Sequence, residues 1–349
     1  MGTFKDRLAP LPLEIEGYDL EGLEFEAPGF TRLSTVIRLR GAGEEGIGED
    51  VTYDALDHVA LQAAGPALDL AGAHTLGSFC AKVAGLDLFP EEPVREVSRR
   101  YRRWAFESAA LDLALRQAGQ PLHEVLGREP RPVTFVASLR LGEPSTIEPV
   151  AKRLARYPDL RFKLDPTNDW TDELIAELVE TGAVDSVDLK GFYSGTPVDV
   201  QTDPELYRRI AEAFPDAWIE DPDLNDETGE VLRPHRDRIT WDAPIHSVED
   251  IESLPFPPKM VNLKPSRIGS LGELFAAYDH CEERGIQAYG GGQWELGPGR
   301  GQIQYLASLH HPDAPNDTAP TGYNDPSVPE GLPASPLDPQ PSETGFRWG

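Results

Sequence analysis

The feature that most constrains the fold is a change of pattern after Pro130, where short apolar strands begin to alternate with helical stretches. This alternation is typical of parallel βαβ units, because a parallel strand is reached only through a crossover of about a dozen or more residues. Helical patterns at 171–181, 204–214 and 271–284 have the length of such crossovers. Eight strands close a (β/α)₈ barrel. The eight candidates begin near Thr134, Leu160, Ser186, Ala217, Ile239, Met260, Gln287 and Ala314, the last with the weakest pattern.

The first third of the chain has a different pattern, which predicts a small α+β unit. Residues 33–40 alternate like a strand, a glycine-rich turn cluster follows, and residues 47–50 return, which indicates an antiparallel hairpin. From about 55 to 119 the pattern is helical, and Gly119 with Pro121 ends the last helix.

A chain of 349 residues exceeds what one hydrophobic core usually serves, so we expect two domains. The predicted class is α/β, a TIM-like, modified (β/α) barrel with an N-terminal α+β capping domain. The predicted divisions are a capping domain at 1–129, a barrel at 130–325, and a proline-rich tail at 326–349 that returns to the capping domain.

The composition excludes several classes of partner. A formal charge of −28 opposes binding to nucleic acid or to an anionic membrane surface, which carry the same sign. No stretch approaches the roughly 18 consecutive apolar residues of a membrane span. The first 20 residues lack the basic start and apolar run of an export signal, and Cys80 and Cys281 form no disulfide framework. We therefore expect a cytoplasmic protein.

The residues that end the predicted strands carry the chemistry, because the active site of such a barrel lies at the carboxyl ends of its strands. Three successive strands end in Asp188, Glu220 and Asp242, a set of carboxylates that suits an octahedral Mg²⁺ ion. Lys163 ends the strand before this set and Lys264 ends the strand after it. Any one of these residues is most simply read as solvated or ion-paired, but the ordered series on five consecutive strands predicts a metal site between two amines.

This series resembles the Lys-x-Lys, Asp, Glu, Asp, Lys pattern of the enolase superfamily, and most closely its muconate-lactonising-enzyme subgroup. That subgroup includes o-succinylbenzoate synthases, dipeptide epimerases and N-acylamino acid racemases. The stretch at 262–269 is particularly similar, and 106–114 with 120–127 resembles the helix of the family's capping domain and its exit. The similarity covers most of the chain and weakens in the proline-rich tail.

The resemblance implies that Asp188, Glu220 and Asp242 bind Mg²⁺ and that Lys163 and Lys264 form an acid/base pair. They would remove a proton next to a substrate carboxylate, and the metal would stabilise the resulting ene-diolate. Arg161 takes the place of the first family lysine, so we expect it to bind a substrate carboxylate. We also expect Mg²⁺ and Arg161 together to lower the pKa of the lysine that acts as the base. Lys190 stands where the family usually has asparagine. It is either an ion-pair partner of Asp188, the reading that we favour, or a substrate contact, and a cation there could weaken or replace the metal.

Other expected contacts come from the last two strands and from the capping domain. By resemblance, the loop after the seventh strand borders the site, and we expect Gln293 and Glu295 there to contact substrate, with Asn316 and Asp317 near the eighth strand. His310 and His311 are expected at the surface, since adjacent helical side chains diverge. The segment at 17–30 is expected either to close over the pocket or to pack as a hairpin in the domain interface.

These features predict an isomerase or lyase that acts on a small carboxylate substrate through racemisation, epimerisation, cycloisomerisation or syn-dehydration. One alternative is an acid-sugar dehydratase, which the absence of histidine from 287–300 disfavours. The other alternative is a ligand-binding or scaffold protein that keeps the fold without the chemistry. By resemblance we also expect a homo-oligomer.

Overall fold

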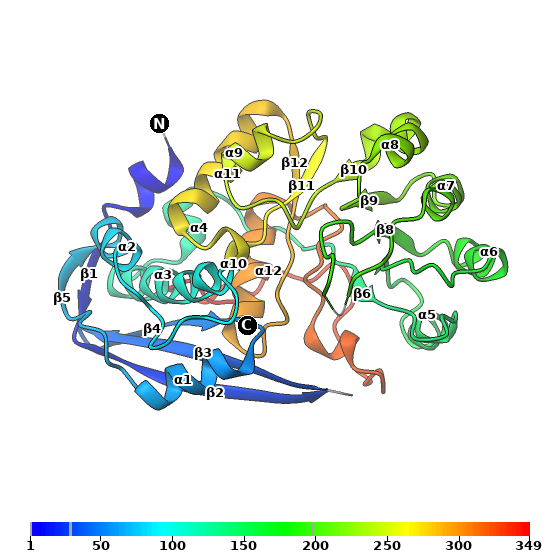
Figure 1. Ribbon diagram of the computed structural model, residues 1–349. Coiled ribbons are helices and arrows are strands. Elements are labelled where there is room, and N and C mark those ends of the chain that lie inside the picture. The colour runs from blue at the N-terminus through cyan, green and yellow to red at the C-terminus, as the bar shows by residue number, and fades with distance from the viewer. Residues whose placement is uncertain (1, 28–29, 197) are drawn as a thin grey trace.

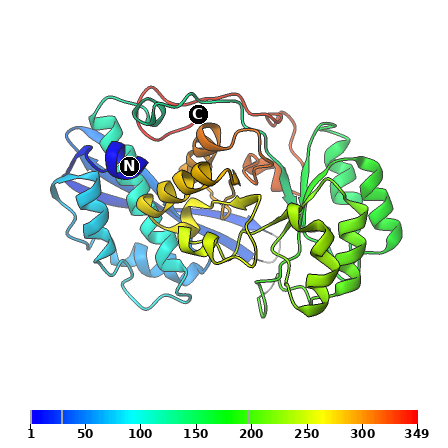
Figure 2. The same cartoon turned by 90° about the horizontal axis from the view of Figure 1, so that it is seen from above.

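The computed structural model describes residues 2–27, 30–196 and 198–349. The N-terminal third lies beside a ring of parallel strands whose helices form its outer side (Figure 1, Figure 2). The predicted α/β fold, a barrel with an N-terminal α+β cap, is confirmed. One hydrophobic cluster includes residues of both parts, among them Phe106 of the cap and Phe162, Ile219 and Phe275 of the barrel.

The capping part contains an antiparallel sheet in the order β2 (Gly17–Ala27), β3 (Phe30–Gly41) and β4 (Glu44–Asp50), so the predicted hairpin is confirmed. The central helix α3 (Ser98–Gln117) packs on β4 at very close range. Gly46 and Gly48 allow this, because a Cβ atom added at either would lie 2.2 or 2.1 Å from a carbonyl oxygen of α3. The remaining elements of this part are η1 (Phe4–Leu8), β1 (Pro12–Ile15), α1 (Ala55–Ala64), β5 (Gly72–Thr75), α2 (Leu76–Ala84), α3 (Ser98–Gln117) and α4 (Leu122–Leu126).

The barrel strands follow one another in chain order. The first five form one parallel sheet, β6 (Ala137–Leu139), β7 (Phe162–Leu164), β8 (Val184–Asp188), β9 (Trp218–Glu220) and β10 (Ile239–Thr240), and β11 (Met260–Asn262) pairs with β12 (Gln287–Tyr289). The Asn262 N–H donates to the Trp241 carbonyl at 2.9 Å and joins the two groups. The predicted eighth strand consists of single bridges from Asp317 to Gly291 and from Asn316 to Phe135, which close the ring.

The crossover helices begin and end where the sequence provides caps. The side chain of Thr171 accepts the N–H of Leu174 at the start of α6, and Gly182 ends this helix with a φ of 61°. None of the helices in the described ranges is long and apolar enough to cross a membrane. The helices of the barrel part are α5 (Glu148–Leu154), α6 (Asp172–Thr181), α7 (Pro204–Ala213), α8 (Asp226–Leu232), η2 (Arg233–Arg238), α9 (Val248–Glu252), α10 (Pro265–Ile268), α11 (Leu271–Arg284), α12 (Pro298–His310) and η3 (Thr321–Asn324).

The C-terminal tail runs from the barrel back over the capping part (Figure 2). The Phe346 N–H donates to Asp112 Oδ1 at 2.7 Å, and the Arg347 guanidinium pairs with Asp112 Oδ2 at 2.8 Å. Because Asp112 belongs to α3, these contacts fasten the end of the chain to the central helix of the cap.

Candidate active site

Three carboxylates lie at the carboxyl ends of neighbouring strands. Asp188 is the last residue of β8, Glu220 is the last residue of β9, and Asp242 follows β10 by two residues. Because these strands are adjacent and parallel, their carboxyl ends meet at the same rim of the barrel. All three side chains are buried, with at most 1% of any residue exposed. Such burial is costly for carboxylates unless cations accompany them.

The Lys163 ammonium lies among these carboxylates. It pairs with Glu220, lies 3.2 Å from Asp188 Oδ2 and lies 3.5 Å from Asp317 Oδ2. Burial lowers the pKa of Lys163, but the three carboxylates outweigh burial and hold this pKa well above its usual value. In this arrangement Lys163 is an ammonium, and the lowering of its pKa that we expect from a bound Mg²⁺ stays a prediction.

A second cluster surrounds Asp242. Lys264 Nζ lies 2.7 Å from Asp242 Oδ2, and Arg267 lies 2.7 Å from Asp242 Oδ1. Burial raises the pKa of Asp242, but Arg267 and Lys264 together lower it well below its usual range. Arg267 was not predicted. Its signal in the sequence was its position three residues after Lys264, because the short helix α10 returns the side chain to the same face.

Lys190 is also a member of the ion-pair network. Its ammonium lies 2.5 Å from Asp188 Oδ2 and 3.2 Å from Asp165 Oδ1. Its main-chain N–H donates to Asp188 Oδ1 at 3.1 Å, and its backbone is in the left-handed region with a φ of 55°. The ion-pair reading of Lys190 therefore describes the contacts of its side chain.

Asp221 is a further buried carboxylate that sequence reasoning missed. In the described part of the chain, one oxygen atom each of Asp188, Glu220 and Asp221 lie within 4.8 Å of one another and could hold a metal ion, whereas Asp242 is not a member of this group. Asp221 accepts the N–H groups of Asp242 and Ala243 at 2.8 and 2.9 Å. Burial raises its pKa to about 7. A φ of 49° turns this side chain inward, which strand alternation does not predict.

The charge balance of the network favours a divalent cation. With every group ionised, six carboxylates against four cations leave a formal charge of −2. Burial raises the pKa of Glu220 well above its usual value, with Asp188 and Asp242 contributing, because its anion has too few cations around it. The carboxylates are Asp165, Asp188, Glu220, Asp221, Asp242 and Asp317, and the cations are Lys163, Lys190, Lys264 and Arg267.

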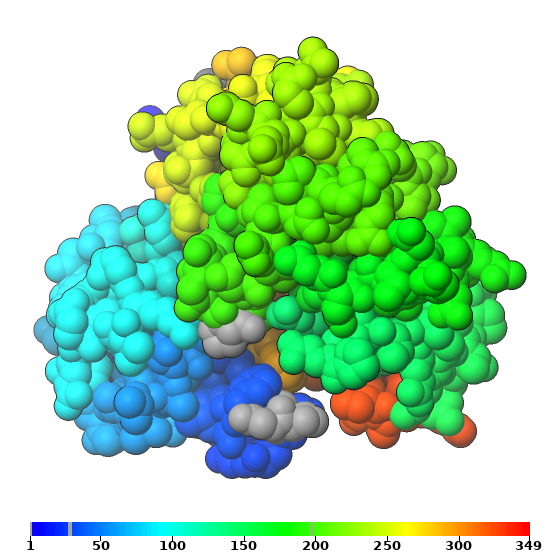
Figure 3. All heavy atoms as spheres, turned by 45° about the vertical axis from the view of Figure 1, so that its right-hand side comes forward, coloured from blue at the N-terminus to red at the C-terminus, as the bar shows by residue number. Residues whose placement is uncertain are grey.

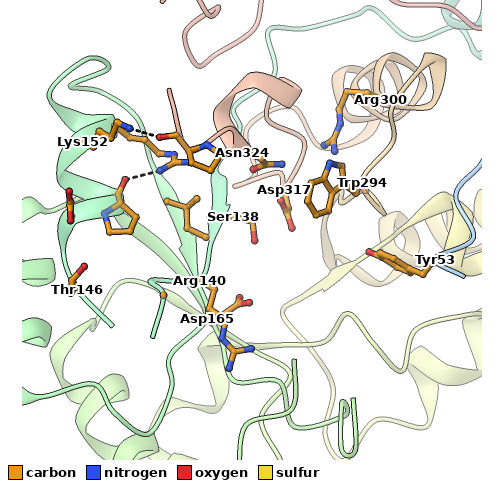
Figure 4. A pocket seen from close by; sticks show the side chains of 17 residues that line it. Tyr53, Ser138, Arg140, Thr146, Lys152, Asp165, Trp294, Arg300, Asp317 and Asn324 are labelled. Carbon is orange, nitrogen blue, oxygen red and sulfur yellow. Dashed lines mark hydrogen bonds between the residues drawn. The ribbon is translucent and has the colours of Figure 1, made fainter. Parts of the chain in front are cut away.

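A cavity of about 680 Å³ opens above this network. Asp165 lines it from below, Tyr53 and Trp294 from one side, and residues of β6, α5 and the segment near 324 from the other, with Asp317 between the two sides (Figure 4). Its mouth lies between the blue hairpin of the cap and the orange-red segment at about 321–330 (Figure 3). Arg140 also lines the cavity. Its Nε is buried without a hydrogen-bond partner, and no ion pair to it occurs in the described ranges.

The hairpin of the capping sheet contacts the wall of this cavity. Phe25 and Phe30 pack on Trp294, with ring centroids 6.2 and 5.2 Å away. Trp294 has a φ of 58°, and its carbonyl accepts a hydrogen bond from the buried Arg32 of β3. The described residues of 17–30 are thus β2 and the first residue of β3, and Phe25 and Phe30 pack against the seventh-strand loop.

Two protein-family models match this chain. A family model described as the N-terminal domain of a domain of unknown function, DUF8230, matches residues 6–125. The model of its C-terminal domain matches residues 129–325. The chain belongs to the DUF8230 family.

Relatives of known activity connect this DUF8230 protein to a larger group. An N-succinylamino acid racemase of Thermus thermophilus is 27% identical over 90% of this chain and 84% of its own. An o-succinylbenzoate synthase of Bacillus subtilis is 28% identical over 65% of this chain and 62% of its own. The structure of a dipeptide epimerase from Methylococcus capsulatus complexed with Mg ion aligns with a TM-score of 0.62 at 22% identity, over 85% of this chain and 86% of that one. The predicted resemblance to enzymes of the enolase superfamily, and to its muconate-lactonising subgroup, is confirmed.

The structure does not bring Arg161 to the site of this DUF8230 protein. Its guanidinium pairs with Asp185 and with the Gly182 carbonyl, which lie at the start of β8 and thus at the far end of the barrel. The prediction of a substrate contact is corrected for a physical reason. The pairing of β7 with β8 shifts register between Phe162 and Lys163, so residues 161 and 163 do not keep the alternation of a regular strand.

Asn316 and Asp317 differ in their roles. The side-chain amide of Asn316 donates to three carbonyls, and its Oδ1 accepts from Gly290 and His311. All polar atoms of this side chain are therefore hydrogen-bonded inside the barrel. The prediction that Asn316 contacts substrate is corrected, and Asn316 is a structural residue. Asp317 lines the cavity beside Lys163.

The predicted residues of the seventh-strand loop are both buried. Gln293 donates through its side chain to Tyr101 at 3.4 Å, and Glu295 pairs with Arg300 at 3.0 Å. Of these, Arg300 lines the cavity. The expectation that His310 and His311 lie at the surface is wrong. Tyr278 stacks on His310, and burial lowers the pKa of His311 to about 4.

Proposed function

We propose that this protein catalyses the Mg²⁺-dependent transfer of a proton at the carbon next to a substrate carboxylate. The observation that carries the proposal is the order of buried groups along the barrel. Lys163 on β7 and Lys264 after β11 stand on the two sides of the carboxylates of β8, β9 and β10. A substrate carbon that lies between the two amines would lose its proton to one of them and regain a proton from the other.

The residues present fit a divalent metal ion. Asp188 and Glu220 offer oxygen atoms to one ion, with Asp242 as the third ligand that the sequence predicts and Asp221 beside them. Asp242 Oδ1 is paired with Arg267 at 2.7 Å, and with every group ionised the network carries two more negative than positive charges. When bound, Mg²⁺ would supply positive charge that stabilises the negative charge developing on the substrate carboxylate.

The two lysines have different starting states. Lys163 is held as an ammonium by Glu220, Asp188 and Asp317, so it can return a proton from Nζ. Within residues 2–27, 30–196 and 198–349, Lys264 has one carboxylate partner, Asp242, which it shares with Arg267. Arg267 therefore balances part of the negative charge of Asp242. As a result, carboxylates hold the ammonium of Lys264 less strongly than that of Lys163.

The cavity supports a small anionic substrate. Its volume of about 680 Å³ lies within the range of small-molecule sites, and Arg140 offers it an unpaired cation. N-acylamino acids are the first class to test, because the N-succinylamino acid racemase aligns over most of both chains. The second candidate is an elimination like that of the o-succinylbenzoate synthases, which align over a smaller share of the chain.

The test is hydrogen exchange in D₂O with Mg²⁺ and each enantiomer of a set of N-acylamino acids, followed by proton NMR. We expect deuterium at the carbon next to the carboxylate. Lys163→Ala should reduce exchange by about 10²–10⁴-fold for one enantiomer and Lys264→Ala for the other, as expected for loss of a general acid or base. Lys259→Ala is the matched control, because this exposed lysine immediately precedes β11 at the opposite end of the strand from Lys264.

The outcomes separate the candidates. Exchange that depends on both lysines supports the proton transfer. Absence of exchange in N-acylamino acids, together with turnover of an elimination substrate, supports the second candidate. No reaction with N-acylamino acids, elimination substrates or acid sugars would refute an enzymatic role and favour a ligand-binding or scaffold protein.

A further inference from the structure

Lys190 occupies an unusual place at the proposed metal centre, because its ammonium bridges a proposed metal ligand and a carboxylate outside the metal group. Its Nζ lies 2.5 Å from Asp188 Oδ2 and 3.2 Å from Asp165 Oδ1. We propose that Lys190 competes with the divalent ion for Asp188, and that Asp165 receives the ammonium when the ion takes Asp188. Lys190 would thus lower the affinity for metal and Asp165 would raise it. This inference rests on the proposed metal site.

The competition follows from the use of the Asp188 oxygen atoms. Oδ2 is 2.5 Å from the Lys190 ammonium and 3.2 Å from the Lys163 ammonium, while Oδ1 accepts the main-chain N–H of Lys190. Mg²⁺ binds a carboxylate oxygen at about 2.0–2.1 Å. A dication at this distance and an ammonium on the same oxygen would repel each other strongly in a buried site. The ammonium of Lys190 must therefore move when the ion binds.

Lys163 is less affected by this competition, since it has other partners. It pairs with Glu220 and lies 3.5 Å from Asp317, so it keeps the carboxylate of Asp317 on the cavity side when Asp188 is taken. Lys190 has only one other carboxylate within ion-pair distance in the described ranges, and this is Asp165.

Asp165 is suited to receive the ammonium. It follows the last residue of β7, lies outside the group of Asp188, Glu220 and Asp221, and lines the floor of the cavity. Its Oδ1, the atom that faces Lys190, is buried and lacks a hydrogen bond of good geometry. An oxygen in this state gains a charge-assisted hydrogen bond when the ammonium approaches. The ring of Tyr193, 5.3 Å from Nζ, offers a further favourable contact to the cation.

The backbone confines the movement to the side chain. Gly191, next in sequence, donates its N–H to the Asp221 carbonyl at 2.8 Å, and a Cβ atom added to it would lie 2.2 Å from the Asp223 nitrogen. The main chain of Lys190 is thus fixed beside Asp188 in a left-handed conformation. Asparagine tolerates this conformation better than most residues, so Lys190→Asn removes the cation with little disturbance of the backbone.

The experiment is a double-mutant cycle read by metal binding. Mn²⁺ is titrated into the full chain and its free concentration is followed by electron paramagnetic resonance, with Mg²⁺ competition as a second measurement. We expect Lys190→Asn to bind Mn²⁺ about tenfold or more tightly than the wild type, and Asp165→Asn to bind it about tenfold more weakly. In the Lys190→Asn background, Asp165→Asn should change the Mn²⁺ affinity by less than about threefold, because Asp165 then has no ammonium of Lys190 to pair with.

Lys152→Gln removes a different cation from the same cavity, one whose Nζ already donates to the Pro326 carbonyl, and should leave the affinity within about twofold. Thermal unfolding followed by circular dichroism establishes that each variant is folded. If Lys190→Asn binds Mn²⁺ no more tightly than the wild type, the inference is wrong. It is also wrong if Asp165→Asn weakens binding equally in both backgrounds, since Asp165 would then act on the ion directly.

The failure of the inference is distinguishable from that of the proposed function. Equal Mn²⁺ affinity in all four proteins would retain the metal site and reject the role of Lys190. If none of the four proteins binds Mn²⁺, the metal site is rejected together with the inference. If Mn²⁺ binds tightly only to the variants that lack Lys190, the inference is supported most strongly, because Lys190 would then exclude the ion from the wild-type site.

Discussion

Individual charged side chains in and beneath the cavity differ in whether a partner already balances their charge. Lys163, Lys190 and Lys264 each face a carboxylate, and Arg300 pairs with Glu295. Arg140, at the end of β6, has neither a hydrogen bond nor an ion pair within the described ranges, and its Nε is buried. A buried donor without a partner is costly, so a ligand carboxylate that meets it gains a charge-assisted hydrogen bond.

Replacement of Arg140 should therefore weaken substrate binding. We expect Arg140→Met to raise KM for a carboxylate substrate about tenfold to a hundredfold and to change kcat less than about threefold, as for loss of an interaction made equally in ground and transition states. Steady-state kinetics with the substrate found by exchange measures both constants. Arg140→Lys keeps the positive charge but not the planar pair of donors, so its KM should lie between those of the wild type and Arg140→Met. A KM that stays at the wild-type value in Arg140→Met would rule out a contact with substrate.

At the scale of elements, the packing of β4 on α3 determines where the capping sheet lies. Gly48 is the closest point of this contact, because an added Cβ atom would lie 2.1 Å from the Ala105 carbonyl oxygen and 2.4 Å from Ser108 Oγ. Neither neighbour can move easily, since both belong to α3, the central helix of the cap. The strand and the helix must therefore separate if residue 48 has a side chain.

Gly48→Ala should destabilise the protein by about 2 kcal/mol, in the range of overpacked cores. Gly17→Ala is the control, because a Cβ atom added to Gly17 in β2 would have no neighbour within 4 Å among the described residues, and it should change the free energy of unfolding by less than about 0.5 kcal/mol. Urea unfolding followed by circular dichroism compares the two. Equal stability of Gly48→Ala and the wild type would mean that β4 can shift on α3 without cost.

The order of the elements was predictable from the sequence, and local irregularities in the strands were not. Seven of the predicted strands begin within about three residues of β6 to β12, because apolar runs bounded by helical patterns define them. The eighth is held by single bridges, since its residues use their side chains, as Asn316 does, to close the ring. The error at Arg161 came from the register shift in β7, and Asp221 was missed because its positive φ reverses the side chain.

At the scale of the whole molecule, segments that are far apart in the sequence contact one another through specific side chains. The order of residues does not reveal which segments meet. The strand ends identified Asp188 and Glu220, but the sequence contained no sign that Lys190, just after β8, faces Asp165, just after β7. The capping sheet fixes the seventh-strand loop through Glu49, whose carboxylate accepts N–H groups of Leu296, Gly297 and Gly299. Such contacts depend on three-dimensional closeness, which residue type and spacing do not encode.

Another of these connections joins the C-terminal tail to the cap through Arg347 and Asp112. Asp112 is fully buried, so burial raises its pKa, and Arg347 opposes this rise. Arg347→Met should remove the opposing charge and raise the pKa of Asp112 further above its unfolded value. The folded protein then carries an unfavourable buried anion above that pKa, and this cost disappears as falling pH protonates the carboxyl group.

We therefore expect Arg347→Met to lower the free energy of unfolding by about 2 kcal/mol at pH 7.5 and by clearly less at pH 4.5. Urea unfolding at the two pH values measures the difference. Arg131→Met is the matched control, since the Arg131–Asp313 pair is exposed on both sides and should contribute less than about 1 kcal/mol at either pH. A loss of stability for Arg347→Met that is the same at both pH values would show that the tail contributes through packing, for example of Phe346 against Trp104, and that the charge of Asp112 is not what fastens it.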